Sequence, residues 1–101
     1  MRLVALYSHP EDPQAFDEAY FNTHLPLLAE VPGLQRTEIT RFDRSLMGGE
    51  LYLMTVMHFE DGEALAAGLK SEEMKQAGEN LQTFASDLTT LLVGQPVLAE
   101  G

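Results

Sequence analysis

Two segments of the chain, residues 2–8 (RLVALYS) and 50–60 (ELYLMTVMHFE), alternate like β-strands but are apolar on both faces. In the second segment one face would carry Leu51, Leu53, Met57 and Phe59, and the other Tyr52, Met54, Val56 and His58. A strand of this kind has to be covered on both sides. Both segments are therefore predicted to be central strands of a sheet.

A helix is predicted from Pro13, with Asp12 as its N-cap. Helical spacing suggests that its inward face carries Phe16, Ala19, Tyr20, Thr23 and Leu27. Pro26 cannot donate to a carbonyl one turn back, so the helix is expected to kink or restart there before the VPG motif at 31–33.

The rest of the chain supplies two more strands and a second helical region. Residues 34–43 form a polar strand, and the glycine pair in 44–50 predicts a hairpin turn into the second apolar strand. Helical segments follow over 61–71 and 71–88, with Asp61 and Ser71 as caps. The last strand, 90–100, contains Gly94 and Pro96 and is expected at an edge or to be broken midway.

The order strand, helix, strand, strand, helix, strand is that of the ferredoxin-like βαββαβ fold, an α+β architecture with a four-stranded antiparallel sheet. Residues 1–101 are predicted to form one domain. With both helices on one face, the other face would expose Tyr7 or Leu6 together with Tyr52, Met54 and Val56. So large an apolar surface predicts a homodimer in which a second sheet covers it.

Composition narrows the possible partners and chemistry. Sixteen acidic residues against six Lys and Arg give a net charge of −10, and no cluster of cations could bind nucleic acid or an anionic membrane. The chain has no cysteine, which excludes disulfides and thiolate chemistry. No apolar run approaches the roughly 20 residues of a membrane span, and no secretory signal is visible, so a cytoplasmic location is expected.

Several motifs together resemble the EthD-like family (ethyl tert-butyl ether degradation protein EthD) of the dimeric α/β-barrel superfamily. They are HPEDP, AFDEAYFNTHLPLL, VPGL, YLMTVMHFED, GEALAAGLKSEE and FASDLTTLL, and the most specific is the aromatic-aromatic-x-x-His-x-Pro run of Tyr20, Phe21, His24 and Pro26. The resemblance implies two sheets facing each other as a barrel, with a pocket between sheet and helices in each subunit. The superfamily includes cofactor-independent monooxygenases, a lactone isomerase, haem-degrading enzymes and peroxidases, so it implies no single reaction.

His24 is the candidate catalytic residue. Tyr20 lies one helical turn before it, so the two side chains are neighbours and Tyr20 could orient the imidazole. In one interpretation His24 is a general base or hydrogen-bond donor at the mouth of an apolar pocket. In the other it is a capping or core histidine that secures the break at Pro26.

Tyr7, Tyr52, Met54 and His58 are the candidate binding residues, and each has packing in the core or dimer interface as its alternative role. No metal site is predicted, because the three histidines lack the i, i+4 spacing of helical ligands. No cofactor is predicted either. A P-loop and a G-x-S-x-G motif are absent, and haem ligation by His24 would rest on analogy with the superfamily alone.

The leading hypothesis is a homodimer that binds a small apolar organic molecule, with proton transfer, cofactor-independent oxygenation or isomerisation in catabolism as its chemistry. The alternative is a non-catalytic carrier or an accessory protein that stabilises another enzyme. A third possibility is an oligomer without a pocket, in which Phe16, Leu27 and Phe84 fill the space beside His24.

Overall fold

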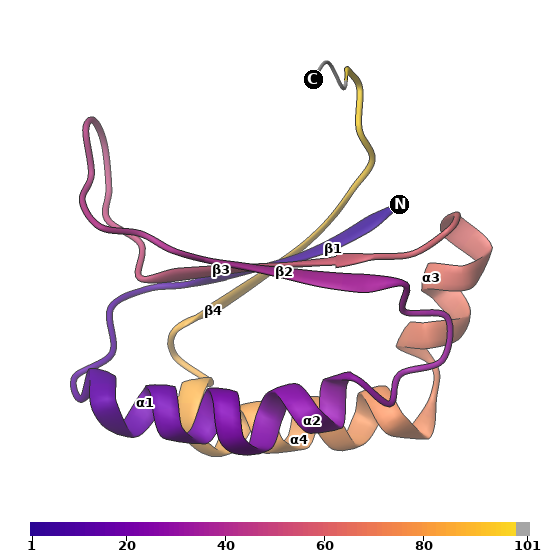
Figure 1. The fold of residues 1–101 in the computed structure, drawn as a ribbon, viewed down its shortest axis with the longest axis horizontal. Coiled ribbons are helices and arrows are strands. Elements are labelled where there is room, and N and C mark those ends of the chain that lie inside the picture. The colour runs from indigo at the N-terminus through magenta and orange to yellow at the C-terminus, as the bar shows by residue number, and fades with distance from the viewer. Residues whose placement is uncertain (99–101) are drawn as a thin grey trace.

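In the computed structural model, which describes residues 1–98, four strands form one antiparallel sheet. The strand order is β2-β3-β1-β4, so β1 (Arg2–Tyr7) and β3 (Leu53–His58) are central (Figure 1). The edges are β2 (Arg36–Arg41) and β4 (Thr89–Gly94). The predicted ferredoxin-like α+β fold is confirmed, including the central position of the two doubly apolar strands.

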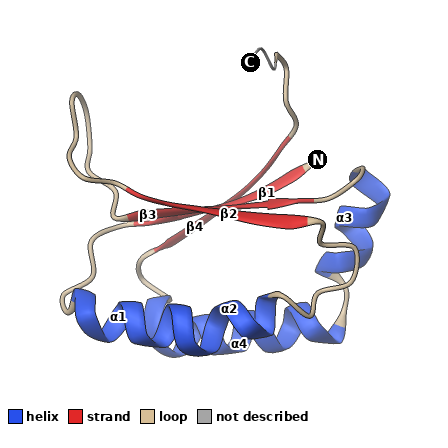
Figure 2. Ribbon diagram, viewed as in Figure 1, coloured by secondary structure: helices blue, strands red, loops and turns tan. Residues whose placement is uncertain are grey.

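The helical segments are α1 (Pro13–Ala19), the π-helical turn η1 (Tyr20–His24), α2 (Leu25–Leu28), α3 (Gly62–Leu69) and α4 (Glu72–Ala85). They cover one side of the sheet, except that α3 stands upright beside the end of the sheet (Figure 2). The three predicted caps are confirmed, because Asp12, Asp61 and Ser71 each accept the backbone N–H three residues later, at 3.1, 2.8 and 3.1 Å.

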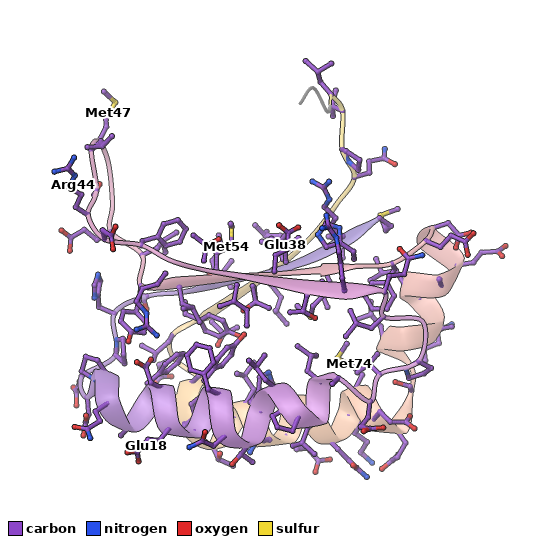
Figure 3. All side chains as sticks on the ribbon, in the orientation of Figure 1. Glu18, Glu38, Arg44, Met47, Met54 and Met74 are labelled. Atoms are coloured by element: carbon purple, nitrogen blue, oxygen red, sulfur yellow. The ribbon has the colours of Figure 1, made fainter. Side chains whose placement is uncertain are left out.

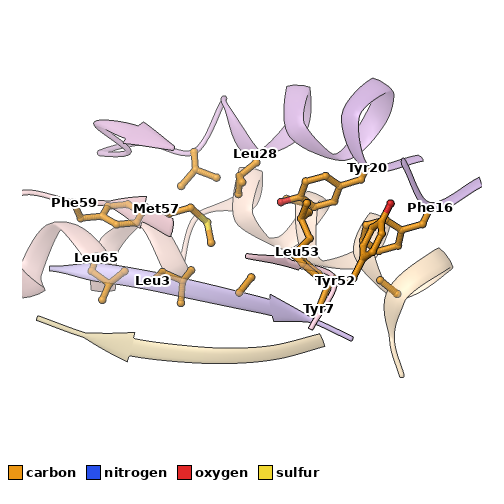
Figure 4. Close-up of a cluster of buried hydrophobic side chains, with 14 residues drawn as sticks. Leu3, Tyr7, Phe16, Tyr20, Leu28, Tyr52, Leu53, Met57, Phe59 and Leu65 are labelled. Atoms are coloured by element: carbon orange, nitrogen blue, oxygen red, sulfur yellow. The ribbon is translucent and has the colours of Figure 1, made fainter. Parts of the chain in front are cut away.

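The core lies between the sheet and the helices. The strand residues that face it are Leu3, Ala5, Tyr7, Leu53, Thr55 and Met57, all buried. Figure 4 shows an aromatic end, with Tyr7, Phe16, Tyr20 and Tyr52, and an end occupied by Leu3, Met57, Phe59 and Leu65.

The opposite side of the sheet, here called the uncovered face, carries no helix. Val4, Val56 and Leu92 lie in one cross-strand row, and Leu6 and Met54 lie in the next. In Figure 3, Met54 and Glu38 point away from the helices. Leu6 rather than Tyr7 occupies this face, because the Tyr7 side chain is only 1% exposed and belongs to the core.

The prediction that Tyr52 shares a face with Met54 is wrong. Tyr52 precedes the first residue of β3, so the alternation of the strand does not govern it. Its ring packs edge-on against Phe16 of α1, and its hydroxyl donates to Asp17 at 2.7 Å. Tyr52 therefore lies on the helix side of the sheet.

The helix is expected to kink or restart at Pro26, and the structure places a restart there, since α2 begins at Leu25 directly after a π turn. Figure 1 shows α1 and α2 as one continuous rod, joined by the π turn η1, in which the Leu25 N–H bonds the Tyr20 carbonyl five residues back. A π turn shifts carbonyls from their α-helical positions, which accommodates the proline that could not donate to the Asn22 carbonyl.

The π turn also changes which residues face the core. The buried positions are Phe16, Tyr20, His24 and Leu28. Thr23, predicted to face inward, is exposed. One extra residue in the turn moves every later inward position forward by one, from 23 and 27 to 24 and 28. The histidine is therefore buried at the end of the turn, on the same side as Tyr20.

The predicted pairing of β2 with β3 is confirmed, but the connection is not a tight glycine turn. Residues 42–52 form a long loop that rises from the uncovered face, with Met47 near its tip (Figure 3). β4 lies at an edge, as predicted, and ends at Gly94. The predicted last strand, 90–100, extended to residues 99 and 100, which lie outside the described part of the chain. None of the helices described for residues 1–98 has the length and apolar character of a membrane span.

Candidate functional site

His24 is enclosed by aromatic rings at the end of the π turn. Its side chain is 4% exposed, and its ring centroid lies 5.3 Å from that of Tyr20, with the two planes 33° apart. On another side the Phe84 ring of α4 approaches edge-on at 6.1 Å. The π turn and α4 together hold the imidazole in the interior.

Tyr20 is fully buried, and both its ring and its hydroxyl group contact other core residues. Its ring stacks on Phe16 and meets Tyr7 edge-on, with centroids 5.6 and 5.3 Å away. Its hydroxyl hydrogen-bonds the Thr55 hydroxyl of β3. Burial raises the pKa of Tyr20, although the hydrogen bonds with Thr55 and Tyr7 oppose the shift. Burial, and secondarily the neighbouring Tyr20, also raises the pKa of Tyr7, so both phenols remain protonated at neutral pH.

The polar atoms beside His24 are incompletely satisfied. Nδ1 of His24 and Oδ1 of Asn80 are both buried without a hydrogen-bond partner. Burial lowers the pKa of His24, while the nearby Asn80 side chain and Ala77 carbonyl act in the opposite direction. The imidazole is therefore neutral at pH 7, which leaves one nitrogen able to accept a proton.

Asn80 was not singled out from the sequence, although a signal was present. The inward stripe of α4 includes Ala77, Leu81 and Phe84, and Asn80 lies three residues after the first and four before the last. A polar side chain within an apolar stripe needs a buried partner. The asparagine faces the same region as His24, and the sequence does not say which partner it meets.

A pocket of about 150 Å³ lies against His24, between the sheet and α4. We call it the His24 pocket. Tyr7 and His24 contribute its polar side chains, and its other lining residues are Leu3, Ala5, Leu28, Met57, Leu69, Met74, Ala77, Gly78, Leu81 and Leu91. Figure 3 shows Met74 in the space between the sheet and the helices. Because this space is open, Phe84 does not fill the surroundings of His24.

The other predicted binding residues do not line this pocket. Tyr52 belongs to a separate group in which Asp17 also pairs with Arg41 at 3.1 Å. Met54 is on the uncovered face. Tyr20 touches His24 but lies behind it, away from the pocket.

His58 is also on the uncovered face, where its Nε2 lies 2.6 Å from Glu38 of β2. Glu38 pairs with Arg36 at 3.2 Å as well. The His58 hydrogen bond first, and the Arg36 charge second, lower the pKa of Glu38. Among residues 1–98, no three His, Asp or Glu side chains are grouped so that they could hold a metal ion.

Comparison with known proteins gives two relatives over nearly the whole chain. A crystal structure of an ethyl tert-butyl ether degradation (EthD) family protein from Bacillus halodurans is 44% identical, covers 95% of this chain and 97% of its own, and superposes with a TM-score of 0.90. An uncharacterised 11.0 kDa protein of Rhodococcus erythropolis, from the thcB–thcC intergenic region, is 33% identical over 90% of this chain and 89% of its own. No protein-family model matches the chain.

More distant structures share the fold alone. A dimeric ferredoxin-like protein from Thermobifida fusca has a TM-score of 0.64 at 16% identity, over 90% of this chain and 87% of its own. SnoaB, a cofactor-independent oxygenase from Streptomyces nogalater, has a TM-score of 0.59 at 17% identity, over 98% of this chain and 95% of its own.

Proposed function

The chain belongs to the EthD family, and we propose that it is a homodimeric cytoplasmic protein that binds a small, mostly apolar organic molecule in the His24 pocket. The observation that carries the proposal is the pocket itself, an apolar space with a buried neutral histidine on its wall. An apolar cavity with a few convergent polar groups is the usual form of a small-molecule site.

The homodimer is inferred from the uncovered face. Val4, Leu6, Met54 and Val56 remain partly exposed there on the two central strands, where a monomer would leave them in water. Two such faces packed together would bury them, and the Thermobifida fusca neighbour is described as dimeric. The His24 pocket lies on the other side of the sheet, so each subunit would keep its own pocket.

The proposed role of His24 follows from its two ring nitrogens. A proton on Nδ1 would face the orphaned Oδ1 of Asn80, which leaves the lone pair of Nε2 as the base. Tyr20 acts as a positioning residue, because its ring is held by Thr55 and contacts the imidazole. The chemistry would be proton removal from the bound molecule, leading to isomerisation or to cofactor-independent oxygenation.

A non-catalytic carrier is the second candidate, and the composition of the pocket favours it. His24 and Tyr7 are the polar side chains on the described pocket wall, and the raised pKa of Tyr7 makes its phenol a poor acid or base near neutrality. A carrier needs only the apolar wall and one hydrogen bond, which His24 or Tyr7 could supply.

Fluorine NMR with two probes tests the binding site. Fluorobenzene offers the pocket an apolar ring alone, whereas 4-fluorophenol adds one hydroxyl that can donate to His24. We expect both to bind, and 4-fluorophenol to bind roughly two- to tenfold more tightly, the worth of one hydrogen bond. His24→Asn keeps a donor near the Nδ1 position but removes Nε2, so this preference should disappear while the melting temperature and dimer mass persist.

Three outcomes contradict parts of the proposal. Failure of both probes to bind the wild type at millimolar concentration rules out the pocket as a ligand site. Equal affinities for the two probes rule out the hydrogen bond to His24. Collapse of the fold in the His24→Asn variant would show that the histidine is structural.

Analytical ultracentrifugation at micromolar concentration tests the dimer. Val56→Glu places a charge in the middle of the uncovered face and should convert the dimer to monomers. Gln76→Glu, at an exposed position of α4 on the other side of the sheet, is the matched control and should leave the dimer mass unchanged. A wild-type monomer, with this face in water, would refute the dimer.

A further inference from the structure

A second hollow adjoins the His24 pocket on its outer side. This outer hollow has a volume of about 290 Å³, and its lining residues are Gly78, Leu81, Gln82, Ser86, Thr89 and Leu91. Gly78, Leu81 and Leu91 also line the His24 pocket. The two spaces therefore lie next to each other at the gap between α4 and β4, on either side of these three residues.

Gly78 has no backbone reason to be glycine. It lies inside α4, and among the described residues only Gly33 and Gly48 have positive φ. A Cβ built on Gly78 would meet no atom within 4 Å, so packing does not require glycine either. Glycine in a helix interior is less stable than alanine. A side chain at this position would stand between the outer hollow and the pocket, because the residue lines both.

The residues that line the two spaces also limit which kinds of ligand could enter. None of the residues that line either space is charged, so an ionic ligand would lose its hydration without gaining a counter-ion. The pocket volume of about 150 Å³ is close to that of an engineered apolar cavity known to bind benzene. His24 lines the pocket, and its Nε2, which the proposed function leaves free to accept a hydrogen bond, calls for one polar group on the ligand.

We propose that the ligand is a neutral molecule of about one six-membered ring with one hydrogen-bonding group, and that it enters between α4 and β4 across Gly78. The glycine is then a specificity-determining residue, because any side chain there narrows the passage. This inference rests on the proposed ligand-binding function and adds to it the route and the class of ligand.

Substitutions at Gly78 test the route with the probes fluorobenzene and 4-fluorophenol. Gly78→Ala should slow probe exchange, measured by ¹⁹F relaxation, while affinity changes less than about twofold. Gly78→Leu should slow exchange further, because the larger side chain narrows the entrance. It should also lower the affinity for both probes about tenfold or more, because Gly78 lines the pocket and the added side chain takes up part of its volume. Glu79→Leu adds the same side chain at the next, exposed position of α4 and should bind both probes like the wild type.

The outcomes separate this inference from the function on which it rests. If the wild type binds the probes and both Gly78 variants match Glu79→Leu in affinity and exchange, the route is wrong and the pocket remains a ligand site. If the wild type binds neither probe, the proposed function fails and the ligand class with it. Far-UV circular dichroism checks the fold, and if Gly78→Leu does not fold, the exchange rate of Gly78→Ala decides.

Discussion

The hydrogen bond between Tyr20 and Thr55 offers a quantitative test of how the core beside the site is stabilised. Both side chains are 0% exposed, so neither hydroxyl can turn to water when its partner is removed. Tyr20→Phe leaves the Thr55 hydroxyl buried and unpaired, at a cost of about 1–3 kcal/mol. Thr55→Val should cost less, about 1 kcal/mol, because the Tyr7 phenol lies beside the abandoned Tyr20 hydroxyl.

The double variant distinguishes the hydrogen bond from simple loss of packing. In the double variant the Thr55 hydroxyl is no longer stranded, and the Tyr7 phenol loses the same neighbour as in Tyr20→Phe. The double variant should therefore be no less stable than Tyr20→Phe alone, which corresponds to a coupling free energy between the two substitutions of about 1 kcal/mol or more. Urea unfolding followed by circular dichroism measures this, at one fixed protein concentration because dimerisation contributes to stability. Strictly additive losses would refute the reasoning. Probe binding should change little in Tyr20→Phe, since the ring against His24 remains.

The remaining predictions concern His24, two glycines and a helix cap. Burial lowers the folded-state pKa of His24 below 6.5, so the unfolded chain takes up a proton first as the pH falls. The free energy of unfolding should therefore drop below about pH 6.5, by up to about 1.4 kcal/mol per pH unit. Urea midpoints at pH 7.5 and 5.5 measure this drop, and the contribution of His24 to it should be absent in His24→Asn. Gly78→Ala should raise the unfolding free energy by about 0.5–1 kcal/mol, whereas Gly68→Ala should lower it by about 1–3 kcal/mol, since its Cβ would lie 2.8 Å from the Phe59 ring. Thermal melts check the pair, and a shift of the same sign in both variants would contradict one of the two predictions. Ser71→Ala should cost about 1 kcal/mol by the same measurement, with an unchanged melting temperature counting against the cap.

Most of the fold could be predicted because burial on two faces is visible in a sequence. The alternation in β1 and β3 identifies them as central strands, and the polar residues of β2 and the glycine that ends β4 identify the edges. The caps were equally visible, because an N-cap interaction spans only three residues.

The site was harder to predict, because it depends on one residue of helical register. Regular α-helical spacing turns Thr23 inward, and the π turn brings His24 there instead. A proline indicates a conflict with the helix but not how the chain resolves it. The prediction that Tyr52 shares a face with Met54 fails for a related reason. Side chains alternate between faces only within a strand, and Tyr52 precedes the first residue of β3. The position of Asn80 near His24, far along the chain, depends on how the helices pack.

The two edges of the sheet differ in how they would meet another chain. β2 exposes charged residues, among them Arg36, Glu38 and Arg41, which discourage an added strand. β4 instead exposes Leu91, Leu92 and Val93 in succession, each more than half exposed. An uncharged, branched run with unpaired backbone groups is where fibrillar growth begins. A net charge of −10 makes chains repel one another and so opposes such pairing, and high salt weakens this repulsion.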